Sequence, residues 1–358
     1  MNQISLLPVL PMRAKRASTR RPALVAACVG LLAVASAACG DEATRDEAPA
    51  GESTTRDVDD APASAPRAPA AQVVEAPAAA APAPSADATA SGGTSLASLN
   101  VSITTEPPKV APWFKVFRPA DLKAVGRPLP VVAWANGGCF RSEFTWDPLF
   151  KRWAAAGIIV LALTANPKDG LLGALTASNV THHKALIEWA VKENETEGSP
   201  YQGLIDTKRL VLAGNSCGGV TALGAAAQEP RASAVFVLSG SSALAATDRN
   251  VMGKIKVPVG YVVGGKEDIA GANALADYEA LSAGVPGLLV SRAQGDHVFV
   301  STTPEVLAEV AKISLDWLDL ALFRTPSAKA TLKSPTVCTG CKAGTWIVKD
   351  KNLETLAP

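Results

Sequence analysis

The distribution of aromatic residues decides which part of this chain can fold. The 7 Trp, 3 Tyr and 8 Phe all lie at or after Trp113. A segment without large apolar side chains cannot build a core, because it buries too little surface to offset the entropy of ordering. We therefore expect one globular domain over residues 96–358, a size that one hydrophobic core can support.

The N-terminal segment has the pattern of an export signal. Basic residues precede an apolar run over 23–38, which is shorter than the roughly 20 residues that a membrane-spanning helix needs. Small residues then lead to Cys39, an order that resembles the bacterial lipobox, in which the cysteine carries lipid. We interpret residues 1–38 as a lipoprotein-type signal peptide. An ordinary cleaved signal, which would give a secreted protein, is the alternative.

Residues 39–95 are predicted to form a disordered tether. They are mainly Ala, Pro, Ser, Thr and acidic residues, a composition that cannot bury a core. Proline-rich segments favour extended conformations. A lipid on Cys39 would anchor the protein in a membrane of the cell envelope. The extended tether would then hold the domain well away from that membrane.

From about residue 100 onward, short apolar runs alternate with helical patterns. Strands are predicted over 130–136, 158–164, 210–213, 234–238, 257–263 and 288–292. Helices are predicted over 147–156, 180–193, 218–228, 272–281 and 304–322. This alternation is typical of the α/β class, with a mostly parallel central sheet and helices on both faces.

A candidate nucleophile follows the strand predicted over 210–213. Residues 214–218 (GNSCG) match the G-x-S-x-G nucleophile elbow and lie between a strand and a helix, as that motif requires. In open α/β sheets the reacting groups lie at the carboxyl ends of the strands. We predict that Ser216 is a nucleophile; an ordinary serine in a glycine-rich turn is the alternative.

A serine nucleophile needs an imidazole to take its proton and a carboxylate to orient that imidazole. His297 is the candidate base because it follows both the serine and the strand predicted over 288–292. His182 and His183 precede the serine in the chain, which does not match the hydrolase order of Ser, acid, His. His183 is expected to lie in the core.

Two acidic residues compete for the third position. Asp268 and Glu267 both follow the strand predicted over 257–263, and Asp268 is preferred. If Glu267 held that position, Asp268 would cap the next helix. Asp296 is interpreted as a turn residue.

Two backbone N–H groups must also stabilise the negative charge that develops on the substrate oxygen. Cys217, directly after the candidate nucleophile, is expected to donate one. The strand end 136–139 (NGGC) is placed like the HGGG-type loop of esterases, so Gly138 or Cys139 is expected to donate the other. Asn136 stands where that loop has His, and a plain turn is the alternative.

These motifs resemble the α/β-hydrolase superfamily, specifically its lidless, secreted dienelactone-hydrolase-like and cutinase-like serine esterases. The likeness rests on residues 136–139 and 214–219, Asp268 and His297, and it extends over about 100–325. It implies an α/β-hydrolase fold and ester hydrolysis through an acyl-enzyme intermediate. It does not identify the ester, because one fold serves many substrates.

The leading interpretation is a serine hydrolase of carboxylic esters. The connection between the strands predicted over 234–238 and 257–263 is too short for a helical cap, so bulky or polymeric esters would fit. Phe140, Phe144 and Trp146 are candidates for an apolar wall against the substrate, with a core position as the alternative. An acyltransferase with the same triad and an inactive binding module are the other functions considered. We expect a monomer with an ester substrate and no cofactor.

The chain has 6 cysteines, and the signal peptide and the lipid site account for Cys28 and Cys39. The remaining four, in an exported domain where thiols oxidise, are Cys139, Cys217, Cys338 and Cys341. The C-x-x-C tail at 338–341 can pair locally, and it resembles that of poorly characterised secreted hydrolases. Cys139 and Cys217 are then expected to pair with each other; two buried thiols are the alternative. No metal is expected, because zinc would need further ligands nearby.

The charge balance argues against a nucleic-acid partner. The chain has 34 Lys and Arg against 33 Asp and Glu, and its net charge is +1. Its basic residues form no block outside the N-terminus, whereas nucleic-acid binding needs a concentrated positive surface.

Overall fold

A single mixed sheet forms the centre of the structure, a computed structural model that describes residues 95–96, 99, 102–106, 113–142, 144–165, 177–243 and 249–357. All of these residues belong to the unit that contains Ser95–Pro358. The predicted signal peptide, Cys39 and nearly all of the predicted tether lie outside the described residues. Those interpretations therefore remain predictions.

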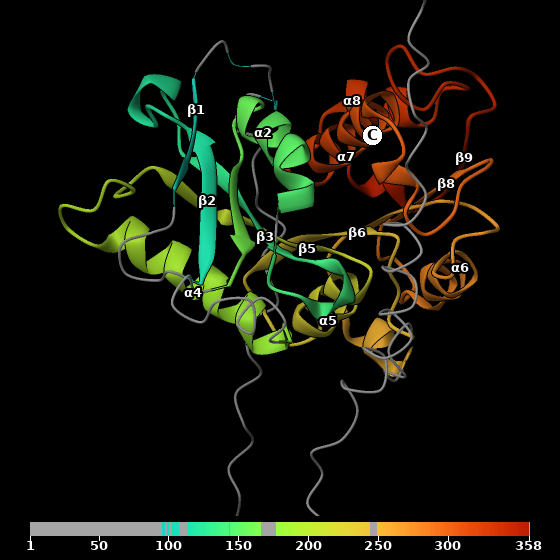
Figure 1. Ribbon diagram of the computed structural model, residues 1–358, viewed down its shortest axis with the longest axis horizontal. Helices are drawn as coiled ribbons and strands as arrows, with labels where there is room; N and C mark the ends of the chain where they lie inside the picture. Colours follow the sequence, from blue (N-terminus) through green and yellow to red (C-terminus); the bar gives the residue numbers. More distant parts are fainter. Residues whose placement is uncertain are drawn as a thin grey trace, which may run out of the picture. The chain divides into compact units, whose positions relative to one another are not determined.

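Nine strands pair in the order β1-β2-β4-β3-β5-β6-β7-β8-β9 within the described part of the chain (Figure 1). Their bounds are β1 (Ile103–Glu106), β2 (Phe114–Pro119), β3 (Leu129–Ala135), β4 (Ile159–Leu163), β5 (Ile205–Asn215), β6 (Ala232–Leu238), β7 (Val259–Val263), β8 (Gly287–Arg292) and β9 (Trp346–Lys351).

The six strands from β4 to β8 are mutually parallel, and they correspond to the six predicted from the sequence. Every residue of β3, β4 and β7 is buried, which explains why these strands read as continuous apolar runs. The strands β1, β2 and β9 were not predicted. They pair antiparallel at the two margins of the sheet.

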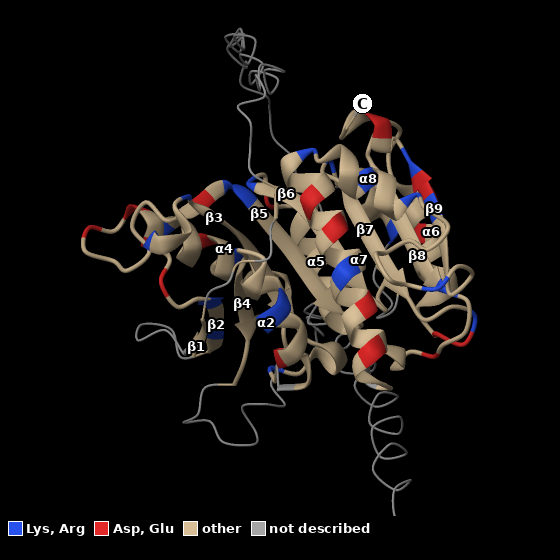
Figure 2. Ribbon diagram, turned by 90° about the horizontal axis from the view of Figure 1, so that it is seen from above, with Lys and Arg blue, Asp and Glu red and all other residues tan. Residues whose placement is uncertain are grey.

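Helices cover both faces of the sheet (Figures 1 and 2). One face carries α2 (Asp147–Ala155), α7 (Pro304–Phe323) and α8 (Pro326–Leu332). The other carries α4 (Val180–Glu195), α5 (Cys217–Ala226) and α6 (Gly271–Ala280). The short 3-10 helices are η1 (Lys123–Val125), η2 (Gly137–Cys139), η3 (Phe144–Trp146), η5 (Arg249–Lys254), η6 (Phe299–Ser301) and η7 (Leu353–Thr355).

Buried tryptophans hold α2 and α7 against the sheet. Trp153 of α2 donates a hydrogen bond from Nε1 to Ser314 Oγ of α7, at 2.8 Å. Trp317 of α7 donates to the carbonyl oxygen of Val235 in β6, at 3.2 Å. A Cβ added at Gly260 of β7 would lie 2.5 Å from the Trp317 ring, so the glycine makes room for the indole. Both indoles are fully buried with their polar atoms bonded, which fixes α7 behind the strands that lead to the site.

Charged residues of both signs are spread along the described helices and strands (Figure 2). None of the helices formed by the described residues combines the length and the apolar character needed to cross a bilayer.

Candidate active site

Ser216 lies in a strained turn between β5 and α5. Its backbone has φ 52° and ψ −119°, a conformation that residues other than glycine rarely adopt. Its N–H donates to the carbonyl oxygen of Leu238 at the end of β6, at 2.9 Å, so the turn is anchored to the neighbouring strand. A strained backbone conformation persists only where the surrounding contacts enforce it, and such conformations are concentrated at functional sites.

The two glycines of the elbow are required by close backbone contacts. A Cβ at Gly214 would lie 2.3 Å from the carbonyl group of Gly218. A Cβ at Gly218 would lie 2.0 Å from the carbonyl oxygen of Ala135, at the end of β3. The G-x-S-x-G spacing therefore reflects how tightly α5 begins against the strand ends.

Ser216, His297 and Asp268 form a continuous chain of hydrogen bonds. The distance from His297 Nε2 to Ser216 Oγ is 2.8 Å, and from His297 Nδ1 to Asp268 Oδ1 it is 2.7 Å. Ser216 comes from the end of β5, whereas Asp268 and His297 come from the loops after β7 and β8. Three carboxyl strand ends thus bring together the residues that the sequence analysis expected there.

The Asp268 side chain is fully buried and well supplied with donors. Its carboxylate accepts the backbone N–H groups of Gly264 and Ala270, each at 2.9 Å, besides the His297 contact. Burial raises the pKa of Asp268, but the hydrogen bonds from His297, Gly264 and Ala270 outweigh it and hold the pKa below its ordinary value. The group is therefore a carboxylate at neutral pH.

The two other acidic residues near the site have different surroundings. Glu267 is exposed, and its backbone forms an isolated bridge with Asp296. The Asp296 carboxylate accepts the N–H of Val298 at 3.0 Å, as a turn residue does. Of the three carboxylates, Asp268 is the one in contact with His297.

The loop after β3 lies directly against the elbow. A Cβ added at Gly137 would lie 3.4 Å from Ser216 Cβ. Gly138 and Cys139 both have positive φ, at 63° and 55°, so the loop makes a tight left-handed turn beside the serine. Asn136 anchors the start of this turn: its side chain accepts from Trp134 Nε1 and donates to the Leu163 carbonyl, both at 2.9 Å.

A disulfide joins Cys139 of this loop to Cys217 of the elbow, with 5.1 Å between the Cα atoms. This is the pairing expected from the sequence. The carbonyl oxygen of Cys139 also accepts the N–H of Ser178, at 2.7 Å, which ties the loop to the chain before α4. A second disulfide joins Cys338 to Cys341 in the C-terminal tail.

The aromatic residues expected to line a substrate wall have different positions. Trp146 is 8% exposed and packs against Trp134 in the core, with 5.5 Å between ring centroids. This corrects the expectation for Trp146, because a ring buried in the core cannot present a face to substrate. Phe140 is half-buried, and its ring covers Gly138, where an added Cβ would lie 2.7 Å from it. The side chain of Phe144 is outside the described part of the structure.

The other two histidines lie on α4. His183 is fully buried, and its Nε2 lies 3.0 Å from the carbonyl oxygen of Ala213. Burial lowers the pKa of His183 to about 4, so the ring is neutral at pH 7. The His182 ring accepts the backbone N–H of Asn179 and so completes the cap at the start of α4. Burial, followed by the nearby Arg141 charge, lowers the pKa of His182.

A buried carboxylate that the sequence analysis did not single out braces the chain after β6. Asp277 of α6 is fully buried and accepts hydrogen bonds from the N–H and hydroxyl of Ser242, at 2.5 and 2.6 Å. The Arg249 Nε donates to the same carboxylate at 3.1 Å. The sequence contains one signal for it, because helical spacing places Asp277 beside the apolar Ala274 and Tyr278.

Two exposed apolar side chains flank the triad residues. Ile269 follows Asp268 and is 61% exposed, and Val298 follows His297 and is 39% exposed. Among the described residues, no group of three or more His, Cys, Asp and Glu side chains is placed to hold a metal ion.

The sheet order and the elbow at its carboxyl edge are those of the α/β-hydrolase class. A family model described as PET hydrolase-like matches residues 130–322, more than half of the chain. The chain belongs to this PET hydrolase-like family, and the family identifies it as a carboxylic-ester hydrolase. No curated protein matches the chain.

Proposed function

We propose that the protein hydrolyses carboxylic esters through an acyl-enzyme intermediate on Ser216. The observation that carries the proposal is the unbroken hydrogen-bond chain from Ser216 Oγ through His297 to Asp268. An inactive binding module would have no need for a buried carboxylate, an imidazole and a strained serine in this arrangement.

Each step of the reaction has a group at the required place. His297 Nε2 takes the proton of Ser216 as Oγ attacks the ester carbonyl carbon, and the Asp268 carboxylate stabilises the resulting imidazolium. His297 then returns the proton to the leaving alcohol. Water attacks the acyl-enzyme with the same histidine as base, which releases the acid and restores Ser216.

The N–H of Cys217 and that of Gly138 or Cys139 are proposed to bind the oxyanion. Cys217 is the first residue of α5, and the first N–H groups of a helix have no partner within the helix. The loop of Gly138 and Cys139 is covalently linked to it by the disulfide. Donors held in advance of the reaction stabilise the developing charge without reorganisation.

Covalent labelling tests the nucleophile. A fluorophosphonate should label the wild-type protein once, with the added mass on the peptide that contains Ser216, and the Ser216→Ala variant should stay unlabelled. Ser282→Ala, which removes a hydroxyl bonded to the Gly253 carbonyl outside the site, is the matched control and should label normally. Labelling of the Ser216→Ala variant would contradict the assignment.

We propose that the substrates are bulky or polymeric hydrophobic esters. The family description supports this, since it refers to hydrolysis of the polyester PET. Between β6 and β7 the residues described, 239–243 and 249–258, form only the short helix η5 and no helical cap. Ile269 and Val298 would then contact an apolar chain that lies across the site.

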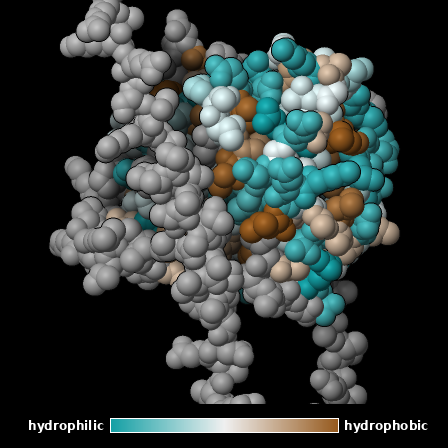
Figure 3. All heavy atoms as spheres, turned by 45° about the vertical axis from the view of Figure 1, so that its right-hand side comes forward, coloured by the Kyte–Doolittle hydropathy of each residue, from teal (hydrophilic) through white to brown (hydrophobic). Residues whose placement is uncertain are grey.

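The proposed contact of Ile269 and Val298 with substrate can be tested against a control residue on strand β9. The face shown in Figure 3 carries separate hydrophobic patches within a hydrophilic surface. Ile269→Ser and Val298→Ser should lower the release of soluble product from a polyester film more than they lower kcat/KM on a short soluble ester. Ile347→Ser on β9, which is 56% exposed, should lower neither. Equal losses for all three variants would contradict the proposal.

We also propose that the protein is exported and lipid-anchored through Cys39. The order of basic, apolar and small residues before Cys39 supports this, and disulfides in the domain suit an oxidising compartment.

A further inference from the structure

A basic cavity lies at the amino edge of the sheet, opposite the edge that carries Ser216. Its volume is about 390 Å³, and its walls are residues in the first half of β5, the start of β6, the residues before β7 and the end of α7. Arg209 in its wall precedes Ser216 by seven residues along β5, which is about 23 Å at 3.3 Å per residue. The cavity is therefore separate from the candidate active site.

Positive charge dominates the lining of this cavity. Lys208, Arg209, Lys256 and Arg324 contribute to the lining, and no acidic residue does. Asp206 pairs with Arg209, whereas the other three cations have no carboxylate partner within the described part of the chain. The end of α7 adds about half a negative elementary charge. A net charge of about +2 to +3 therefore remains around an open space.

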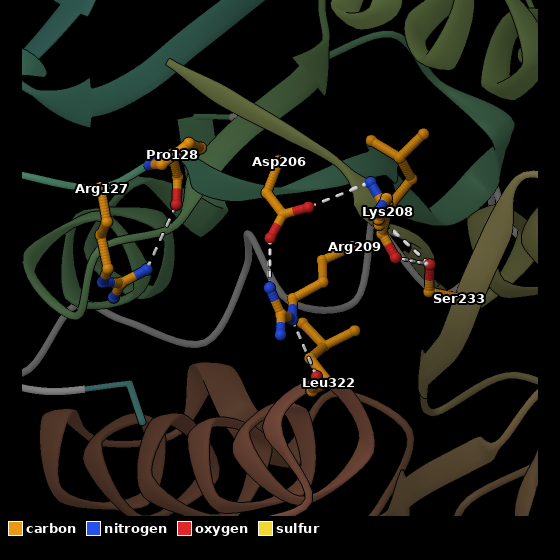
Figure 4. A network of polar contacts seen from close by, with 8 residues as sticks. Arg127, Pro128, Asp206, Lys208, Arg209, Ser233 and Leu322 are labelled. Atoms are coloured by element: carbon orange, nitrogen blue, oxygen red, sulfur yellow. Dashed lines mark hydrogen bonds and ion pairs between the residues drawn. The ribbon is translucent and has the colours of Figure 1, made fainter. Parts of the chain in front are cut away.

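Three contacts with protein groups hold the Arg209 guanidinium in the wall of the cavity. Its Nε donates to the Leu322 carbonyl at 2.9 Å, and its Nη1 bonds to Asp206, which also accepts the backbone N–H of Lys208 (Figure 4). The guanidinium carbon lies 4.4 Å from the centre of the Phe323 ring. These contacts fix the guanidinium plane and leave Nη2 without a partner among the described residues.

One cation of the lining is also partly removed from water, because burial lowers the pKa of Arg324. Guanidinium groups nevertheless stay charged at neutral pH. Arg324 occupies a left-handed position, φ 60°, at the C-terminal cap of α7, where glycine is the usual residue. The sequence thus places a cation where a neutral residue would cost less.

We propose that this cavity binds a phosphate-type oxyanion, either as a free phosphate ester or as the phosphate of a lipid headgroup. A doubly charged phosphate matches the excess positive charge better than a single carboxylate does. Planar guanidinium donors suit phosphate oxygens, and the lysines add point charges. The volume is sufficient for a phosphate group with a small substituent.

Calorimetric titration of the full chain with inorganic phosphate tests the site, with chloride used to hold ionic strength constant. We expect saturable binding with a Kd near or below about 1 mM. The triple variant Lys208→Gln, Lys256→Gln and Arg324→Gln should bind at least about tenfold more weakly. Lys151→Gln, on the exposed side of α2, should bind like the wild type.

Circular dichroism and thermal melting establish whether the triple variant is folded. If it is not, Lys256→Gln alone should still weaken binding about threefold, because its side chain is exposed and bonded only to the Gly253 carbonyl among the described residues. Absence of saturation in the wild type, or equal affinity of wild type and charge variants, would overturn the proposal.

Lipid vesicles and a soluble phosphate ester distinguish the phosphate of a lipid headgroup from a free phosphate ester. Phosphatidylglycerol vesicles should retain more wild type than triple variant if the ligand is a headgroup, and phosphatidylcholine vesicles correct for the N-terminal segment that both proteins share. If glycerol phosphate binds and vesicle retention is the same for both proteins, the ligand is a soluble ester. If glycerol phosphate does not bind and phosphatidylglycerol vesicles retain both proteins equally, phosphate recognition is contradicted.

Discussion

Cys139 and Cys217 join the two loops that are proposed to bind the oxyanion, and their Cα atoms lie 5.1 Å apart. The N–H of Cys217 is itself one of the proposed donors, so under that proposal the crosslink would act on the oxyanion site directly. A disulfide in this position serves two purposes, because it also closes a loop across 78 residues of the chain.

Removal of this disulfide should lower both stability and turnover. In the chain-entropy treatment, a loop of this length contributes about 4.5 kcal/mol to the free energy of unfolding, as an upper figure. The double variant Cys139→Ala and Cys217→Ala keeps both backbone donors but loosens their spacing, so kcat should fall by about 10- to 100-fold. Denaturant unfolding and steady-state kinetics measure the two effects.

The second disulfide is the matched control. Cys338 and Cys341 close a much shorter loop, worth about 2 kcal/mol in the same treatment, and they lie in the C-terminal tail. Their replacement by Ala should lower stability less and leave kcat within about twofold. Equal effects on kcat from both pairs would argue against a role for the Cys139–Cys217 bridge in catalysis.

The proposed triad should behave as a unit. Ser216→Ala and His297→Ala should each lower kcat by about 10³- to 10⁶-fold, and the double variant should be little worse than either, because each change already abolishes the same step. Rates on a soluble p-nitrophenyl ester measure this. Losses that multiply in the double variant would show that the two residues act independently.

The carboxylates at 267 and 268 should differ sharply. Asp268→Asn should lower kcat by about 10⁴-fold, since an amide cannot stabilise the imidazolium and favours the wrong tautomer of His297. Glu267→Gln changes the neighbouring exposed carboxylate and should keep kcat within about twofold. If Glu267→Gln is inactive and Asp268→Asn is active, Glu267 and not Asp268 is the acid of the triad.

The buried His183 should make the fold sensitive to acid. Its folded pKa of about 4 lies below the ordinary 6.5, so between these values the unfolded chain binds a proton that the folded chain does not. Stability is therefore lost as pH falls from about 6.5 to 4, by about 3 kcal/mol from this residue.

A non-titrating replacement isolates that contribution. His183→Gln can still donate to the Ala213 carbonyl, so its free energy of unfolding should fall less steeply than that of the wild type between pH 6.5 and pH 4. Urea unfolding at several pH values measures both slopes. Parallel slopes would mean that His183 titrates alike in the folded and unfolded states.

Cys39 should determine where the protein fractionates. If it carries lipid, Cys39→Ser should release the protein from the membrane fraction, while kcat on a soluble ester stays the same because the predicted tether separates anchor and site. Immunoblots of fractions and rates measure the two outcomes. Unchanged fractionation would instead support a cleaved signal peptide.

The sequence predicts the parallel part of the sheet well because those strands are buried on both faces. The marginal strands escape detection for the opposite reason. Lys115 and Arg118 interrupt the apolar residues of β2, and β9 ends in Lys349, Asp350 and Lys351. Such strands are defined by antiparallel pairing with distant segments, which no local pattern reports.

The candidate site also contains some residues that the sequence predicts and others that it does not. Ser216, Asp268 and His297 can be located from a motif and from strand ends, which are local features with a fixed meaning in this class of sheet. The burial of Trp146 depends on its packing against Trp134, and the role of Asp277 depends on partners far away in the chain. Tertiary packing decides both, so the sequence alone could not.

The contact between Gly218 and the Ala135 carbonyl, where even a methyl group has no room, packs the start of α5 directly against the end of β3. The position of Ser216 is therefore set by the framework, whereas Asp268 and His297 lie on the loops after β7 and β8. Surface residues such as Ile269 and Val298 are free to diversify without disturbing the chemistry. Redesign of substrate preference should consequently begin at those surface positions and leave the glycines of the elbow unchanged.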